Sequence, residues 1–247
     1  MAETTQHREL KRLTCRWLRE QGFLAVGMEV QDPTGRFRVD VAGWTDRAVG
    51  TRVRMKPRSV LVECKQSRND YFRNSRQTAG LLARRAAILD RLSRSQPEAS
   101  PLFTSGRRAP LSLFESGTLA DDARALQRLR VEMASIERRL FRGIKLANMA
   151  RWRGATQFWL AAPIDMISTS ELPLGWGLIE ASPQALESRT PEGIPASSIL
   201  SCRQAAPDQE VDDRSLDRLV RNIAVANSRF VGGRTAPMAG RSSFLAG

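Results

Sequence analysis

The sequence predicts an α/β fold in which a central β-sheet is flanked by helices and carries an inserted basic helical hairpin. Three observations lead to this prediction. A helical segment is followed by three strand-like segments, two further strand-like segments occur after residue 155, and two long arginine-rich segments with helical periodicity lie between these groups. A chain of 247 residues, 41% of them hydrophobic, is long enough for one domain with a large insertion.

The first part of the expected sheet follows an N-terminal helix over residues 7–22, where leucine and tryptophan recur at helical spacing. Residues 23–30 are expected to form a strand. Residues 37–44 alternate apolar and polar side chains, as a half-buried strand does, and 59–65, SVLVECK, is rich in β-branched residues. The basic connection at 45–58 is expected to bulge away from the sheet.

The expected hairpin spans residues 75–154. Its helices are predicted over 71–95 and about 119–149, with a Pro/Ser/Gly-rich loop at 96–118 between them. A plain helical layer over the sheet is the alternative, because an apolar stripe would serve either arrangement.

Strand character returns at 156–163 and 175–181. Residues 182–210 are expected to be a loop, and 212–229 a short amphipathic helix. The tail from 232 is rich in Gly, Ser and Ala and is expected to be frayed.

The positive charge is unevenly distributed. The net charge of +13 divides into +6 for residues 1–74, +9 for 75–155 and −2 for 156–247. A surface that meets a polyanion has such a basic region, so nucleic acid is the expected partner. An arginine-rich genome would also raise the arginine count, but it does not account for the acidic last third.

Several classes of function have no support in the sequence. Cys15, Cys64 and Cys202 are far apart and odd in number, which argues against a disulfide framework. His7 is the only histidine and is expected to lie on the surface, so a Cys/His zinc site or a serine hydrolase triad is nearly excluded. No apolar stretch approaches bilayer length and no apolar signal segment is present, so a cytoplasmic, non-membrane protein is expected.

Two carboxylates and an ammonium are expected to converge at one end of the sheet. Asp40 and Glu63 lie on consecutive predicted strands, and a period of two places Lys65 on the same face as Glu63. Buried like charges are costly unless a cation lies between them, and oxygen ligands suit Mg²⁺ or Mn²⁺. The main-chain carbonyl of Cys64 could complete the ligand shell, and Lys65 could hold an attacking water.

These residues resemble the motifs of the PD-(D/E)xK nuclease superfamily, whose fold is restriction-endonuclease-like with a mixed sheet. The segments RVDVAGW, LVECKQSRNDYF and FWLAAP…ELPLGWGLIEA are similar to its MmcB-like, phage-associated branch. The resemblance covers about residues 5–74 and 155–182. It implies a core over 1–74 and 155–182, the inserted hairpin, and a C-terminal region at 183–247 made of loop, short helix and flexible tail.

The resemblance implies a metal-dependent DNA endonuclease, in DNA repair or in the processing of mobile-element DNA. Asp40, Glu63 and Lys65 would be catalytic, with Mg²⁺ or Mn²⁺ on Asp40, Glu63 and Cys64. A glutamate on the preceding helix is common in the superfamily, and Glu9 is the candidate here. The candidate DNA-binding residues are Arg38, Gln66, Ser67, Arg68, Arg84, Arg85, Arg138 and Arg139.

Other interpretations stay open at this level. Asp40 could pair with Arg36 or Arg38 at the surface, and Glu63 and Lys65 could form a simple ion pair. The chain could be a catalytically inactive DNA-binding module of the same fold. A protein partner could also dock on the hairpin, provided that its apolar stripe is exposed. The sequence leaves the substrate form and the oligomeric state open.

Overall fold

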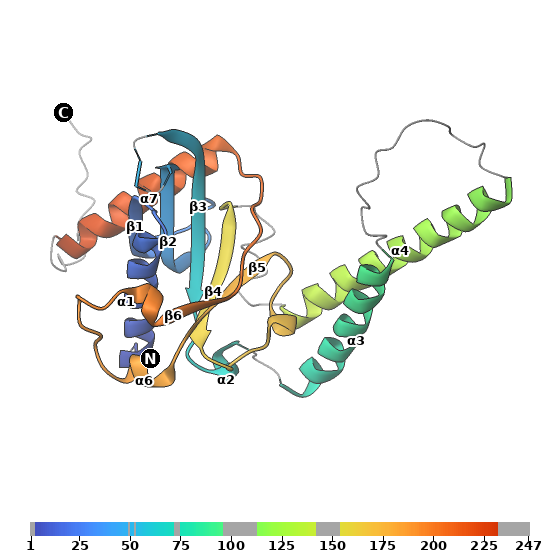
Figure 1. Cartoon of the computed structure of the whole chain (residues 1–247), viewed down its shortest axis with the longest axis horizontal. Helices are drawn as coiled ribbons and strands as arrows, with labels where there is room; N and C mark the ends of the chain where they lie inside the picture. The colour runs from blue at the N-terminus through green and yellow to red at the C-terminus, as the bar shows by residue number, and fades with distance from the viewer. Residues whose placement is uncertain are drawn as a thin grey trace, which may run out of the picture.

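A computed structural model describes residues 3–48, 50–51, 53–71, 75–95, 113–141 and 154–231. It is an α/β structure with a six-stranded mixed sheet flanked by helices (Figure 1). The strands are β1 (Ala25–Gln31), β2 (Arg38–Arg47), β3 (Arg54–Cys64), β4 (Gln157–Pro163), β5 (Trp176–Ala181) and β6 (Leu200–Gln204). The helices are α1 (Thr5–Glu20), α2 (Arg68–Tyr71), α3 (Ser75–Arg94), α4 (Leu113–Leu140), α6 (Pro183–Glu187) and α7 (Asp213–Val231), with 3₁₀ turns η1 (Thr169–Glu171) and η2 (Ala196–Ser198).

The strands follow one another in the sheet in chain order. β1, β2 and β3 form an antiparallel meander, β3 and β4 run parallel, β4 and β5 run parallel, and β6 is antiparallel to β5. Since parallel neighbours need a crossover, the chain between β3 and β4 leaves and re-enters the sheet, and it carries α3 and α4 on the way.

Five strands lie where the sequence predicts them, but two expectations about the sheet are wrong. Residues 45–58 do not bulge away, because β2 and β3 continue as a long hairpin in which Arg47 pairs with Arg54. The segment 182–210 is not all loop, because it contains β6 at the edge of the sheet. Three of the five β6 residues are exposed, so this strand lacks the apolar content that helps to predict the other strands.

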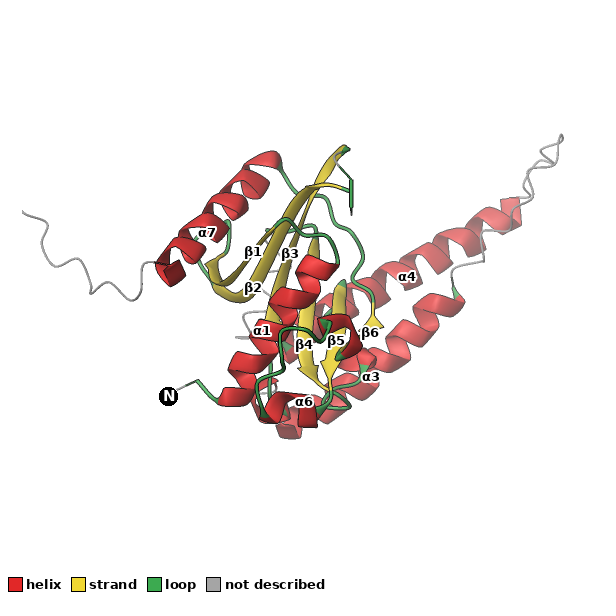
Figure 2. Ribbon diagram, turned by 60° about the vertical axis from the view of Figure 1, so that its left-hand side comes forward, coloured by secondary structure: helices red, strands yellow, loops and turns green. Residues whose placement is uncertain are grey.

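Helices cover both faces of the sheet (Figure 2). α1 packs on one face through Leu10, Leu13 and Leu18, which join a buried cluster with β-strand residues such as Val62. α7 packs on the other face against β1, where Ile223 belongs to a second buried cluster. Thr4 begins α1, because its hydroxyl accepts a hydrogen bond from the His7 amide, and Gly22 ends it with φ 86°.

α3 and α4 form the expected hairpin, which extends from one side of the sheet (Figure 1). The apolar stripe of α4, Leu129, Met133, Ile136 and Leu140, is buried in the same cluster as Ile88 of α3 and residues of the sheet. This stripe is therefore part of the core and does not offer a docking surface to a protein partner. The expected loop at 96–118 is too long, because α4 already begins at Leu113. Residues 96–112, the expected end of the second helix at 142–149, and the expected tail at 232–247 lie outside the described residues.

The three cysteines are free. Of the four tryptophans that lie on apolar faces and are therefore expected in the core, Trp17, Trp159 and Trp176 are buried and Trp44 is partly buried. No helix in the described ranges has the length and apolarity needed to cross a bilayer.

Candidate active site

The meander brings three carboxylates into one row across the sheet. Met28 pairs with Val41 and Val30 with Val39, so Glu29 of β1 lies opposite Asp40 of β2. Val41 pairs with Val62, so the next position along places Asp40 beside Glu63 of β3. The pairing of neighbouring strands that the sequence predicts therefore brings Asp40 and Glu63 together.

A backbone hydrogen bond ties Asp40 to the residues that follow Glu63. The amide of Cys64 donates to Oδ2 of Asp40 at 2.8 Å. Cys64 is buried, and it lies between Glu63 and Lys65 in the sequence. The bond therefore holds the Asp40 carboxylate at the end of β3. Burial, with the nearby charges of Asp40 and Glu63, raises the pKa of the Cys64 thiol well above its ordinary value. This thiol is accordingly protonated, and the main-chain carbonyl of Cys64 is the atom that can act as a ligand.

Lys65 extends past the end of β3 and faces two carboxylates. Its Nζ lies 3.7 Å from Oε1 of Glu63 and 3.5 Å from Oδ2 of Asp70. Its own amide donates to the carbonyl of Ala161 at 2.9 Å, which continues the parallel pairing with β4 one residue beyond the strand. The side chain is mostly buried, so the ammonium is held near Glu63.

A second ammonium, that of Lys11 on α1, lies on the other side of Asp40. Its Nζ is 3.0 Å from Oδ1 of Asp40 and 2.8 Å from Oε1 of Glu3, and it also donates to Glu29. The residue is only 5% exposed. Burial lowers the pKa of Lys11, but the charge of Asp40 and the bonds to Glu29 and Glu3 outweigh it and raise this pKa above its ordinary value. Lys11 is therefore a permanent cation within the site.

His7 lies one helical turn before Lys11 on the same side of α1. Its Nε2 is 3.6 Å from Oδ1 of Asp40 and 3.9 Å from Oε1 of Glu3. The expectation that the only histidine is an ordinary surface residue is wrong, because the side chain is mostly buried against the candidate site. The spacing of His7 and Lys11, i and i+4, indicates a shared helix face, but it does not indicate that this face meets Asp40.

Glu29 has an unusual backbone conformation for its position in a strand. Its φ is 55°, in the left-handed region that side chains other than glycine rarely adopt. Besides Lys11, its carboxylate contacts the guanidinium of Arg38 at 2.7 Å. Residues in such conformations cluster at functional sites, where surrounding contacts maintain the strain.

Glu9, the predicted acidic residue of the first helix, belongs to a different group. Its carboxylate accepts bonds from Arg12 at 2.8 Å and from the Thr190 amide at 2.8 Å. Burial raises the pKa of Glu9, but the bonds from Arg12 and Thr190 outweigh it and hold this pKa below the ordinary value. Glu9 therefore fastens α1 to the loop after α6, and the α1 residues at Asp40 are His7 and Lys11.

The predicted DNA-binding residues next to the site all have partners within the protein. Arg38 contacts Glu29, and Gln66 accepts a bond from the hydroxyl of Thr4. The Ser67 hydroxyl accepts from the Asp70 amide at 3.2 Å, as a cap of the short α2 helix. Arg68 donates to Glu171 at 2.9 Å.

The predicted hairpin arginines differ in what they contact. Arg84 pairs with Glu132 of α4 at 2.6 Å on the exposed side. Arg85 is 2% exposed and donates to Glu137 and to the carbonyls of Ser170 and Leu172, so it is not available to bind DNA. Arg138 and Arg139 are exposed near the end of α4.

The donors at this site fit a hard divalent cation in chemical type. Asp40 and Glu63 offer carboxylate oxygens and Cys64 offers a carbonyl oxygen, the ligands that Mg²⁺ and Mn²⁺ prefer. Within the described part of the chain, however, no three Asp, Glu, His or Cys side chains are arranged to hold a metal ion. Both oxygens of Asp40 have donors, Lys11 on Oδ1 and the Cys64 amide on Oδ2.

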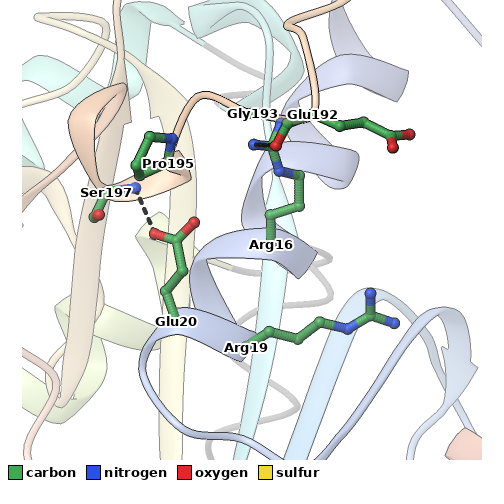
Figure 3. A pocket seen from close by; sticks show the side chains of 7 residues that line it. All are labelled: Arg16, Arg19, Glu20, Glu192, Gly193, Pro195 and Ser197. Atoms are coloured by element: carbon green, nitrogen blue, oxygen red, sulfur yellow. Dashed lines mark hydrogen bonds between the residues drawn. The ribbon is translucent and has the colours of Figure 1, made fainter.

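An open, shallow hollow lies elsewhere, at the C-terminal end of α1 (Figure 3). This cavity of about 480 Å³ is lined by Arg16, Arg19, Glu20, Glu192, Gly193, Pro195 and Ser197. Arg16 donates to the carbonyls of Pro191 and Glu192, and Glu20 accepts from the Ser197 amide at 2.8 Å. These bonds fasten the loop before β6 to α1.

No protein-family model matches the chain, and no curated protein matches it. A solved structure, the SPO1766 protein of unknown function from Silicibacter pomeroyi, is similar at 15% sequence identity and a TM-score of 0.44. The alignment covers 93% of this chain and 91% of that one, and a similarity at this level supports no inference about function.

Proposed function

We propose that this protein is a metal-dependent DNA endonuclease with a restriction-endonuclease-like core, of the PD-(D/E)xK type. One observation carries the proposal. The amide of Cys64, between Glu63 and Lys65, donates to the carboxylate of Asp40. Asp40 is therefore held at the end of β3 that carries Glu63 and Lys65. A sheet used only as a scaffold has no reason to place two carboxylates and an ammonium together at a strand end.

Each side chain has a distinct role in this proposal. Asp40, Glu63 and the carbonyl of Cys64 would hold the cation. The bound cation would polarise a phosphoryl oxygen and acidify a water molecule. Lys65, held 3.7 Å from Glu63, would donate a hydrogen bond to the attacking water or neutralise charge that develops on the phosphate.

The proposed contact with DNA uses the charge of the hairpin. Arg128, Arg130, Arg138 and Arg139 are exposed on α4. Guanidinium contacts with phosphates position a duplex without reading its sequence, so binding is expected to be salt-dependent and weakly selective.

Cleavage of plasmid, single-stranded and branched DNA in Mg²⁺, Mn²⁺ or EDTA tests the proposal. The wild type is compared with Asp40→Asn and Lys65→Ala, and Asp208→Asn, an exposed carboxylate before α7, serves as the matched control. We expect metal-dependent cutting by the wild type and the control, and a loss of about 100-fold or more in the two site variants.

Two results would contradict the proposal. Cutting that persists in EDTA would remove the role of the cation. Salt-sensitive DNA binding with no cutting on any substrate would instead identify a catalytically inactive DNA-binding module of the same fold.

A further inference from the structure

Lys11 lies where it obstructs the proposed cation. Its ammonium is 3.0 Å from Oδ1 of Asp40, and the Cys64 amide takes Oδ2. An ammonium and a divalent ion cannot share one carboxylate oxygen at contact distance without strong mutual repulsion, which is little screened at a buried position. An ion that binds Asp40 through Oδ1 must therefore meet Lys11.

Lys11 also has other carboxylates to hold it. Oε1 of Glu3 lies 2.8 Å from its Nζ, and Glu29 accepts a hydrogen bond from the same ammonium. Glu3 is on the N-terminal segment and is more exposed than Asp40, whereas Glu29 sits in its strained strand position. If Lys11 left Asp40, its charge would stay paired, so leaving does not require a bare buried ammonium.

We propose that Lys11 is a built-in counter-cation of Asp40 that competes with the divalent ion, and that ion binding displaces Lys11 from Asp40 and leaves it paired with Glu3 and Glu29 alone. This inference rests on the proposed function, because it concerns the same carboxylate. It gives Lys11 a positioning role: without the ion, Lys11 compensates the charge of Asp40 and keeps the carboxylate in place, and it sets how tightly the ion binds.

Calorimetric titration of the whole protein with Mn²⁺, in the absence of DNA, measures this competition. Lys11→Met keeps the length of the side chain and removes its charge, whereas Lys11→Arg keeps the charge and is the matched control. We expect Lys11→Met to bind Mn²⁺ about tenfold or more tightly than the wild type, and Lys11→Arg to show no such gain. A purely structural lysine predicts equal or weaker binding by Lys11→Met, and that result would overturn the inference.

This titration distinguishes failure of the proposed metal site from failure of the proposed competition by Lys11. If neither the wild type nor Lys11→Met binds Mn²⁺, both the proposed metal site and this inference are overturned. If both bind with equal affinity, the metal site stands and the competition does not.

A measurement on the wild type covers the case in which Lys11→Met does not fold. Lys11 is buried and Lys56 is exposed, so acetylation by an N-hydroxysuccinimide ester, followed by mass spectrometry, compares the two amines in one sample. Saturating Mn²⁺ is expected to raise the labelling of Lys11 relative to Lys56 about threefold or more, since the ion displaces Lys11 from Asp40. Unchanged relative labelling would overturn the proposed displacement of Lys11 from Asp40.

Discussion

Arg84 and Arg85 are adjacent in α3, yet their environments differ completely. Arg85 is buried and bonds Glu137 and two main-chain carbonyls, whereas Arg84 meets Glu132 at the surface. We expect Arg85→Met to lower the free energy of unfolding by about 2–4 kcal/mol, because Glu137 and the carbonyls lose their donor. Denaturant unfolding of both variants measures this, and Arg84→Met should leave the midpoint nearly unchanged. Equal effects at the two positions would contradict the assigned environments.

The lowered pKa of Glu9 predicts that the stability of the fold depends on pH. Its pKa in the folded protein is held below the ordinary 4.5, so it stabilises the fold above that pH, and this stabilisation is lost as the pH falls through the lowered pKa. Glu9→Gln should reduce stability at pH 7 and lose less than the wild type on acidification below about 4.5. Thermal unfolding at neutral and acidic pH checks this, and parallel losses in both proteins would count against the role of Glu9.

At the residue scale, strand periodicity and pairing are enough to predict that Asp40, Glu63 and Lys65 meet. Both depend on local chain geometry, which the sequence pattern carries. The contacts of Lys11 and Glu29 depend instead on how α1 docks on the sheet, and no local pattern specifies that. Arg85 could not be distinguished from Arg84 for the same reason, since only the packing of η1 buries one of them.

At the element scale, the contact between β4 and β5 requires a glycine. A Cβ on Gly177 would lie 2.4 Å from Cε3 of Trp159, whose ring is itself packed edge-on against Trp17 at 5.5 Å. Because the ring has no free space to move into, we expect Gly177→Ala to destabilise the protein by about 1–3 kcal/mol. Gly193→Ala, which meets nothing within 4 Å, is the control. Thermal melting should separate the two, and an unshifted Gly177→Ala would contradict this packing.

The elements that were predicted correctly share a buried face. β2 to β5 contain continuous buried runs rich in apolar residues, and α7 buries Leu219, Ile223 and Ala226 at helical spacing, so these patterns are visible in the sequence. β6 exposes most of its side chains and is held by pairing with β5, which the sequence pattern does not record. The same applies to the outer part of the β2–β3 hairpin, whose arginine-rich ends suggested a loop.

At the scale of the whole molecule, exposed arginines occur on several elements, and on α4 they include Arg138 and Arg139. Arg138→Ala with Arg139→Ala should weaken DNA binding and lower the slope of log affinity against log salt by about 0.9 for each phosphate that is no longer neutralised. Arg214→Ala with Arg218→Ala, on exposed positions of α7, removes the same charge from another element. Binding measured across salt concentrations compares the pairs, and equal effects would mean that net charge, rather than the hairpin, governs binding.

Glu63→Gln tests most directly whether the end of β3 is a hydrolytic centre. This change keeps the shape of the side chain and removes its charge beside Lys65. The measurement is the rate of plasmid nicking in Mg²⁺ at saturating DNA, with DNA affinity measured in parallel. We predict a rate loss of about 100-fold or more with affinity within about threefold of the wild type. Nicking by Glu63→Gln at the wild-type rate would contradict a hydrolytic centre at the end of β3.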